Sequence, residues 1–181
     1  MTVRTRVYRV PIVSESEWRF DTSAGVDISI GLSSFLFLAG TIGGLWVKRD
    51  SDRDPVRLTY GGLGGGLGLS LVPSPVNISF SLPQMPSEGR IYKTIHARET
   101  LDLNEIRGPF LLIQGSADAG PGYSGSLMFL GGSKPDPLLL LQRSNIVGFI
   151  LTCYGCVRFG GMTATLLPFN LNLSVYGGLL L

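Results

Sequence analysis

Three residues of this 181-residue chain have the types that a nucleophilic catalytic triad needs. His96 is the only histidine, and Asp102 and Ser124 are its natural companions as orienting acid and nucleophile. Ser124 lies in the flexible segment 120–126, with the sequence GPGYSGS. This segment is not a G-x-S-x-G nucleophile elbow, because its last position is serine and no strand–turn–helix pattern surrounds it. A hairpin turn rich in serine and glycine therefore explains it better than a catalytic site.

Cys153 and Cys156 form a C-x-x-C pair, a spacing found in zinc sites and in redox pairs. A structural zinc site needs four ligands, and one histidine with no further cysteine supplies too few. The redox version normally opens a helix, whereas the flanks 150–152 and 157–159 look like strands. We therefore predict two buried, unreactive thiols, and neither a metal nor a cofactor.

Composition narrows the class of protein. The net charge of +2 is too balanced to indicate a nucleic-acid binder. The 25 glycines and 11 prolines argue against an all-helical fold, because both residues destabilise helix interiors. The length fits a single domain over residues 1–181. The N-terminal segment lacks the long apolar run of a secretory signal, so we expect a protein that is cytoplasmic as made or exported by a signal-independent route.

The elements that must position these residues show a period of two. Apolar and polar residues alternate over 26–33, 67–71, 76–82 and 169–175, which is typical of strands with one apolar face. The charged segment 50–54 separates two apolar runs and predicts a hairpin between 41–48 and 55–60. The pattern predicts an all-β, glycine-rich antiparallel sandwich or closed barrel of roughly ten strands. At most one short helix is expected, near 94–106.

Three stretches carry no charge at all: 28–47, 58–87 and 159–181. The first has the length of a transmembrane helix, although its glycines and hydroxyl residues dilute it. A second interpretation is a barrel whose apolar residues face outward into a membrane. The interpretation that we favour is a soluble sandwich or barrel whose interior takes the apolar face.

No complete catalytic set accompanies these stretches, so we expect a non-enzymatic protein that acts through apolar surface. Its partner would be a lipid, a membrane surface or another protein, and not a nucleic acid. Two other hypotheses remain: a hydrolase that uses Ser124 with His96, and a self-assembling structural subunit, which would be a homo-oligomer. Candidate contact residues are the aromatic and leucine side chains of the charge-free stretches: Phe35, Phe37, Trp46, Tyr60, Leu63 and Leu67.

Overall fold

The computed structural model describes residues 12–32, 36–70, 76–81, 89–118, 121–132, 143–164 and 170–181. Within this part of the chain, nine strands and two helices form. The strands are β1 (Ile12–Gly31), β2 (Leu36–Arg49), β3 (Val56–Ser70), β4 (Val76–Ser81), β5 (Gly89–Thr94), β6 (Gly108–Asp118), β7 (Pro121–Leu130), β8 (Gly155–Ala164) and β9 (Asn170–Leu180). The helices are α1 (Leu103–Ile106) and α2 (Arg143–Thr152).

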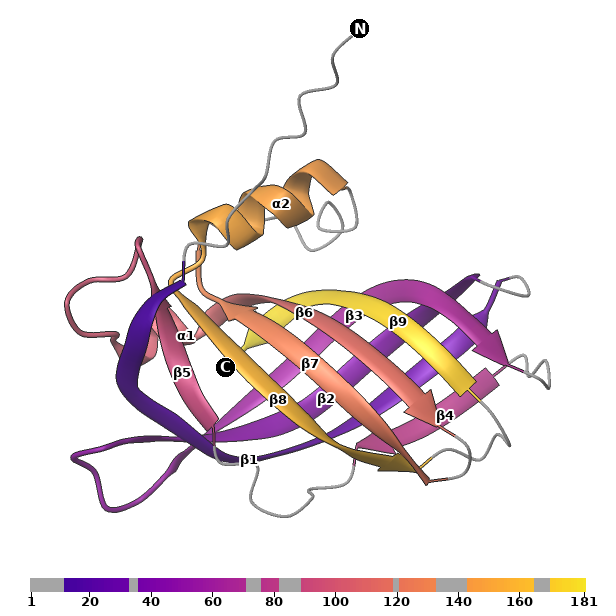
Figure 1. The fold of residues 1–181 in the computed structure, drawn as a ribbon, viewed down its shortest axis with the longest axis horizontal. Coiled ribbons are helices and arrows are strands. Elements are labelled where there is room, and N and C mark those ends of the chain that lie inside the picture. The colour runs from indigo at the N-terminus through magenta and orange to yellow at the C-terminus, as the bar shows by residue number, and fades with distance from the viewer. Residues whose placement is uncertain are drawn as a thin grey trace, which may run out of the picture.

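The strands form one antiparallel sheet that closes on itself (Figure 1). The strand order is β2-β3-β9-β6-β7-β8-β4-β1-β5, and the additional β1–β2 and β5–β8 pairings close the ring. The short strands β4 and β5 both pair with the long strand β1. The first pairs with residues 25–30 of β1 and the second with residues 12–20. Closure satisfies the backbone hydrogen bonds that an open sheet would leave free at its edges.

The sequence-based fold is confirmed: the protein is all-β, and the sheet is a closed barrel. The predicted hairpin is also present, because β2 pairs with β3 across the charged segment 50–54. The transmembrane helix considered for 28–47 is wrong, because these residues belong to β1 and β2 where the structure describes them. Neither of the two helices in the described ranges has the length and hydropathy of a membrane-spanning helix.

The helices differ from the prediction. The helix expected near 94–106 is reduced to the single turn α1, which begins after Asp102. The backbone N–H of Asp102 donates a hydrogen bond to the Glu105 carboxylate at 2.9 Å and caps this turn. The second helix, α2, was not predicted. After a polar first turn its residues 146–151 are apolar or glycine, so they lack the 3.6-residue periodicity by which a surface helix is recognised.

A hydrophobic core fills one half of the barrel, which we call the capped half. Trp18 and Phe20 of β1 lie in it, and the Trp18 indole N–H donates to the carbonyl of Leu101 at 2.7 Å. Leu101 and Ile106 of the segment around α1 are fully buried and close the barrel at this end. The remaining core side chains come from strands all around the ring: Ala39, Leu45, Val47, Leu58, Tyr60, Ile91, Phe110, Leu112, Met128, Leu130, Val157, Tyr176 and Leu180.

Candidate functional site

The direction of the apolar side chains reverses along single strands. On β2, Leu45 and Val47 point into the core, whereas Leu36, Leu38 and Ile42 are exposed on the outside. The strand has no register shift against β3, so its side chains keep their alternation between inside and outside throughout. The change is therefore in the sequence: the large aliphatic residues occupy odd positions in the capped half and even positions beyond Gly43 and Gly44, where Phe37 and Ala39 still point inward.

The neighbouring strands reverse at the same level. On β3, Leu58 is fully buried, while Leu63 and Leu67 are exposed to 65% and 60%. On β9, Leu180 is fully buried, while Leu171 and Leu173 are exposed. A closed barrel in water normally places its apolar residues inside, so the second half of this barrel has the opposite polarity.

We call the exposed apolar side chains of this second half the apolar belt. It runs over β1, β2, β3 and β9, which are consecutive in the ring, and returns on β7. Its members are Ile28, Ile30, Leu32, Leu36, Leu38, Ile42, Leu63, Leu67, Leu127, Leu171 and Leu173. Contiguous apolar surface of this extent marks an interaction site, since single exposed leucines are common but bands of them are not.

The interior of the belt half is polar. A cavity of about 30 Å³, room for one or two water molecules, lies inside it. The side chains that line it come from β1, β2, β6 and β9: Asp27, Ser29, Phe37, Gln114, Ser116, Asn172, Ser174 and Tyr176. The belt half is thus apolar outside and polar inside, which is the polarity expected of a barrel surrounded by hydrocarbon.

Asp27 is the one charged residue between positions 22 and 47, and it lies inside the barrel. Its carboxyl group is hydrogen-bonded by Thr41 and Gln114, and burial raises its pKa above the usual value because these bonds only partly replace water. Burial, with the nearby Asp27 charge, also raises the pKa of Tyr60 to about 12. The interior therefore favours neutral, hydrogen-bonded groups.

The variant Asp27→Asn tests this interior in lipid-free buffer. A raised pKa means that the folded state holds the proton more tightly than the unfolded chain. The Asp27 carboxyl therefore contributes its full share to the free energy of unfolding below its unfolded-state pKa of about 3.9. This contribution is lost as the pH rises through the pKa of the same group in the folded state. We expect the variant to melt above wild type at pH 8, with the difference shrinking toward pH 4.

The same substitution at the exposed Asp54 serves as the control and should melt as wild type does at pH 8. A variant at position 27 that melts lower than wild type at pH 8 would contradict a carboxylate penalised by burial.

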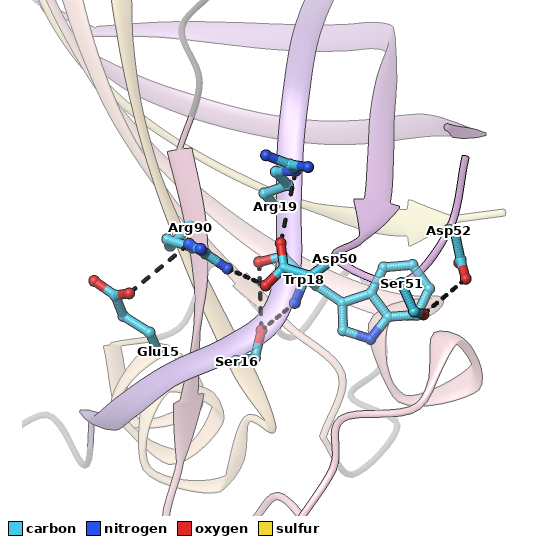
Figure 2. Close-up of polar contacts among 8 residues, drawn as sticks. All are labelled: Glu15, Ser16, Trp18, Arg19, Asp50, Ser51, Asp52 and Arg90. Carbon is cyan, nitrogen blue, oxygen red and sulfur yellow. Dashed lines mark hydrogen bonds and ion pairs between the residues drawn. The ribbon is translucent and has the colours of Figure 1, made fainter. Parts of the chain in front are cut away.

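Charged side chains cluster at the opposite end of the barrel (Figure 2). Arg90 of β5 contacts Asp50 at 2.6 Å and Glu15 of β1 at 3.8 Å, and Arg19 reaches the same Asp50 at 3.7 Å. These pairs are solvent-exposed, so water and salt screen them and they add little to the stability of the fold. Their main consequence is a difference between the two ends of the barrel. The charged end must stay in water, and the other end carries the apolar belt.

The predicted contact residues are divided between the two faces of the barrel. Leu63 and Leu67 belong to the belt. Trp46 lies on the outside of β2 just beyond Ile42, with the Arg57 guanidinium 5.3 Å from its ring centre. Phe37 and Tyr60 point inward: the first lines the cavity, and the second packs edge to face on Phe110. Phe35 lies outside the described residues.

The structure does not bring the predicted triad together. Ser124 is on β7, six positions before Leu130, which corresponds to about 20 Å along the strand. Leu130 accepts a hydrogen bond from Tyr154, which in turn accepts one from Thr94, so the exposed His96 lies at the far end of the barrel. The geometry therefore does not favour the hydrolase hypothesis, which requires hydrogen-bond reach between base and nucleophile.

The C-x-x-C pair lies where α2 meets β8. Both thiols are free and buried, and burial raises the pKa of Cys153 to about 11 and that of Cys156 to about 12. The strand predicted over 150–152 is wrong, because these residues end α2. A thiol at the C-terminal end of a helix gains no thiolate stabilisation from the helix dipole. No group of three or more metal-ligating side chains occurs within the described ranges.

Sequence reasoning missed most of the belt and the inward carboxyl of Asp27. The signal was available in part, because the alternation over 26–33 separates Ile28 and Ile30 from Asp27. Alternation shows which residues share a face, but it does not show which face is outside.

Comparison with known proteins adds one similarity. The chain is 29% identical over 142 residues to the toxin protein Tse4 of Pseudomonas aeruginosa, an alignment that covers 71% of this chain and 68% of that protein. No protein-family model matches the chain, and no solved structure matches it.

Proposed function

We propose that this protein is a membrane-active, toxin-like protein that seats its apolar belt in a lipid bilayer. The observation that carries the proposal is the reversed polarity of the belt half, with leucine and isoleucine outside and a polar cavity inside. In hydrocarbon, a closed barrel also keeps its backbone polar groups hydrogen-bonded, which an open sheet cannot do.

The shape of the belt favours lipid over a protein partner. The belt covers four consecutive strands of the ring and reaches β7 beyond them, so a protein partner would have to enclose much of the barrel. A bilayer surrounds an inserted object without any specific fit. The ion pairs around Asp50 at the opposite end remain in water when the belt is immersed.

The energy available is large enough for stable binding. Full burial of a leucine or isoleucine side chain contributes about 1.5–3 kcal/mol, and the belt side chains are about half exposed. At roughly 1 kcal/mol each, the belt would contribute on the order of 10 kcal/mol before the cost of association. The similarity to a protein named as a toxin supports a harmful action on the membrane that is contacted.

The proposal is tested with purified protein and phosphatidylcholine vesicles loaded with a self-quenched dye. We expect the chain to co-sediment with the vesicles and to release the dye. Neutral lipid is chosen because it removes simple charge attraction. Recovery of all protein in the supernatant, for neutral vesicles and for vesicles containing anionic lipid, would sink the proposal.

A further inference from the structure

The outer surface of β2 changes from aliphatic to ionic within a few residues. Ile42 is the last belt residue on this strand, and the next two outward positions are Gly44 and Trp46. Asp50, the centre of the ion pairs at the charged end, comes directly after the strand. If the belt lies in hydrocarbon and Asp50 in water, Trp46 lies at the boundary between them. Tryptophan is enriched at this depth in membrane proteins, because the indole combines an apolar ring with a polar N–H.

Trp46 is paired with a basic residue across the β2–β3 ladder. Its partner Arg57 is exposed, and the guanidinium carbon lies 5.3 Å from the centre of the indole ring. Both side chains extend over Gly44, because a Cβ at that position would lie 3.1 Å from the Trp46 ring and 3.6 Å from Nε of Arg57. Gly44 lies between Trp46 and Ile42 on the outside of β2, so the pair leans toward the belt.

The charge of Arg57 has no ionic partner in the described part of the chain. The ion pairs found there involve Arg19, Arg90 and Arg98, and none involves Arg57. A guanidinium stacked on a ring keeps its N–H groups in its own plane, where they can donate two hydrogen bonds to a phosphate. The arginine stem can also lie along apolar surroundings while its charged end reaches the polar layer. Arg57 therefore suits an anionic group that borders hydrocarbon.

We infer that Trp46 and Arg57 form a headgroup site, in which Arg57 binds the phosphodiester of a phospholipid and Trp46 fixes the depth of the belt. The inference rests on the proposed function and names the lipid group that this border of the belt recognises. A lipid phosphate is the ligand because the belt side chains hold the bilayer against this pair. A single exposed guanidinium would hold a free phosphate ion only weakly.

The variant Arg57→Gln, made in the full chain, tests the site with two kinds of neutral vesicle. Phosphatidylcholine carries a phosphodiester, whereas digalactosyldiacylglycerol has an uncharged sugar headgroup without phosphate. On phosphatidylcholine we expect the variant to bind about threefold more weakly than wild type, because one exposed charge-assisted contact is lost. On the galactolipid the two proteins should bind equally. Arg53→Gln is the matched control, because Arg53 is an exposed arginine in the loop of the same hairpin, and it should bind both vesicles as wild type does.

The depth of Trp46 is measured by its fluorescence in vesicles of brominated phosphatidylcholine. Bromine near the headgroup end of the acyl chains should quench Trp46 more strongly than bromine near the chain ends. The variant Trp46→Phe should remove this difference. Trp18, the other tryptophan of the chain, is buried in the core and gives a constant background.

Three results would overturn the headgroup site and leave the belt proposal intact, provided that wild type binds vesicles. These are unchanged binding of Arg57→Gln to phosphatidylcholine, an equal loss on the galactolipid, and stronger quenching of Trp46 by the deeper bromine. The pair would then only stabilise the β2–β3 hairpin. If wild type binds neither kind of vesicle, the proposed function fails and the headgroup site fails with it.

Discussion

The double variant Ile42→Lys/Leu63→Lys is expected to bind neutral lipid vesicles at least about 100-fold more weakly than wild type. Both side chains are among the most exposed of the belt, at 60% and 65%, on neighbouring strands. A lysine on the lipid face of a barrel costs about 2–4 kcal/mol at the centre of a bilayer. In water the same lysines would be well solvated, so the fold should be retained.

Co-sedimentation over a range of lipid concentrations measures the effect, and circular dichroism with thermal melting checks the fold. The control Ile95→Lys removes an equally exposed isoleucine outside the belt and should bind as wild type does. Binding of the double variant within threefold of wild type would show that the belt is not the lipid-contacting surface.

Gly64→Ala is expected to lower the free energy of unfolding by about 2 kcal/mol or more. Gly64 of β3 faces the interior of the barrel. A methyl group there would collide with the carbonyl oxygen of Val175 and the backbone of Tyr176 on β9. The two strands pair without interruption, so the backbone must move if the collision is to be relieved. Glycine at this position permits the close approach that tight curvature of the sheet requires.

Gly61→Ala provides the comparison on the same strand. Its added methyl group would meet no atom within 4 Å, so we expect a change within about 0.5 kcal/mol. Urea denaturation followed by tryptophan fluorescence gives both values. Equal stability of the two variants would mean that the β3–β9 contact is looser than the structure describes.

The two predictions test different parts of the barrel: the first tests its exposed apolar side chains, and the second tests the close contact between β3 and β9. The capped half, with its core around Phe20 and Phe110, is built like any water-soluble β-protein and stabilises the ring. The belt half adds little apolar burial of its own, because its leucines point away from the interior. The glycines of β3 and β9 allow the ring to close tightly around a small polar cavity, and the belt remains available for a partner.

Several features could be predicted because they depend on local sequence alone. Period-two alternation over 26–33 and 67–71 indicates strands in any tertiary context, and the charged segment 50–54 marks a hairpin wherever the strands lie. The weakness of Ser124 as a nucleophile could also be judged locally, since the elbow pattern is absent. Helix α2 could not be predicted, because its residues 146–151 are apolar or glycine and show no 3.6-residue period.

Alternation by itself determined that Leu63 and Leu67 share one face, that Leu36 and Leu38 share another, and that no charge interrupts either. It left open whether those faces form a core or a surface, because exchanging inside and outside leaves the pattern unchanged. Only ring closure decided this. Once Leu45, Val47 and Leu58 fill the capped half, the continuous register of the same strands forces Leu36, Leu38 and Leu63 outward, and Asp27 is enclosed.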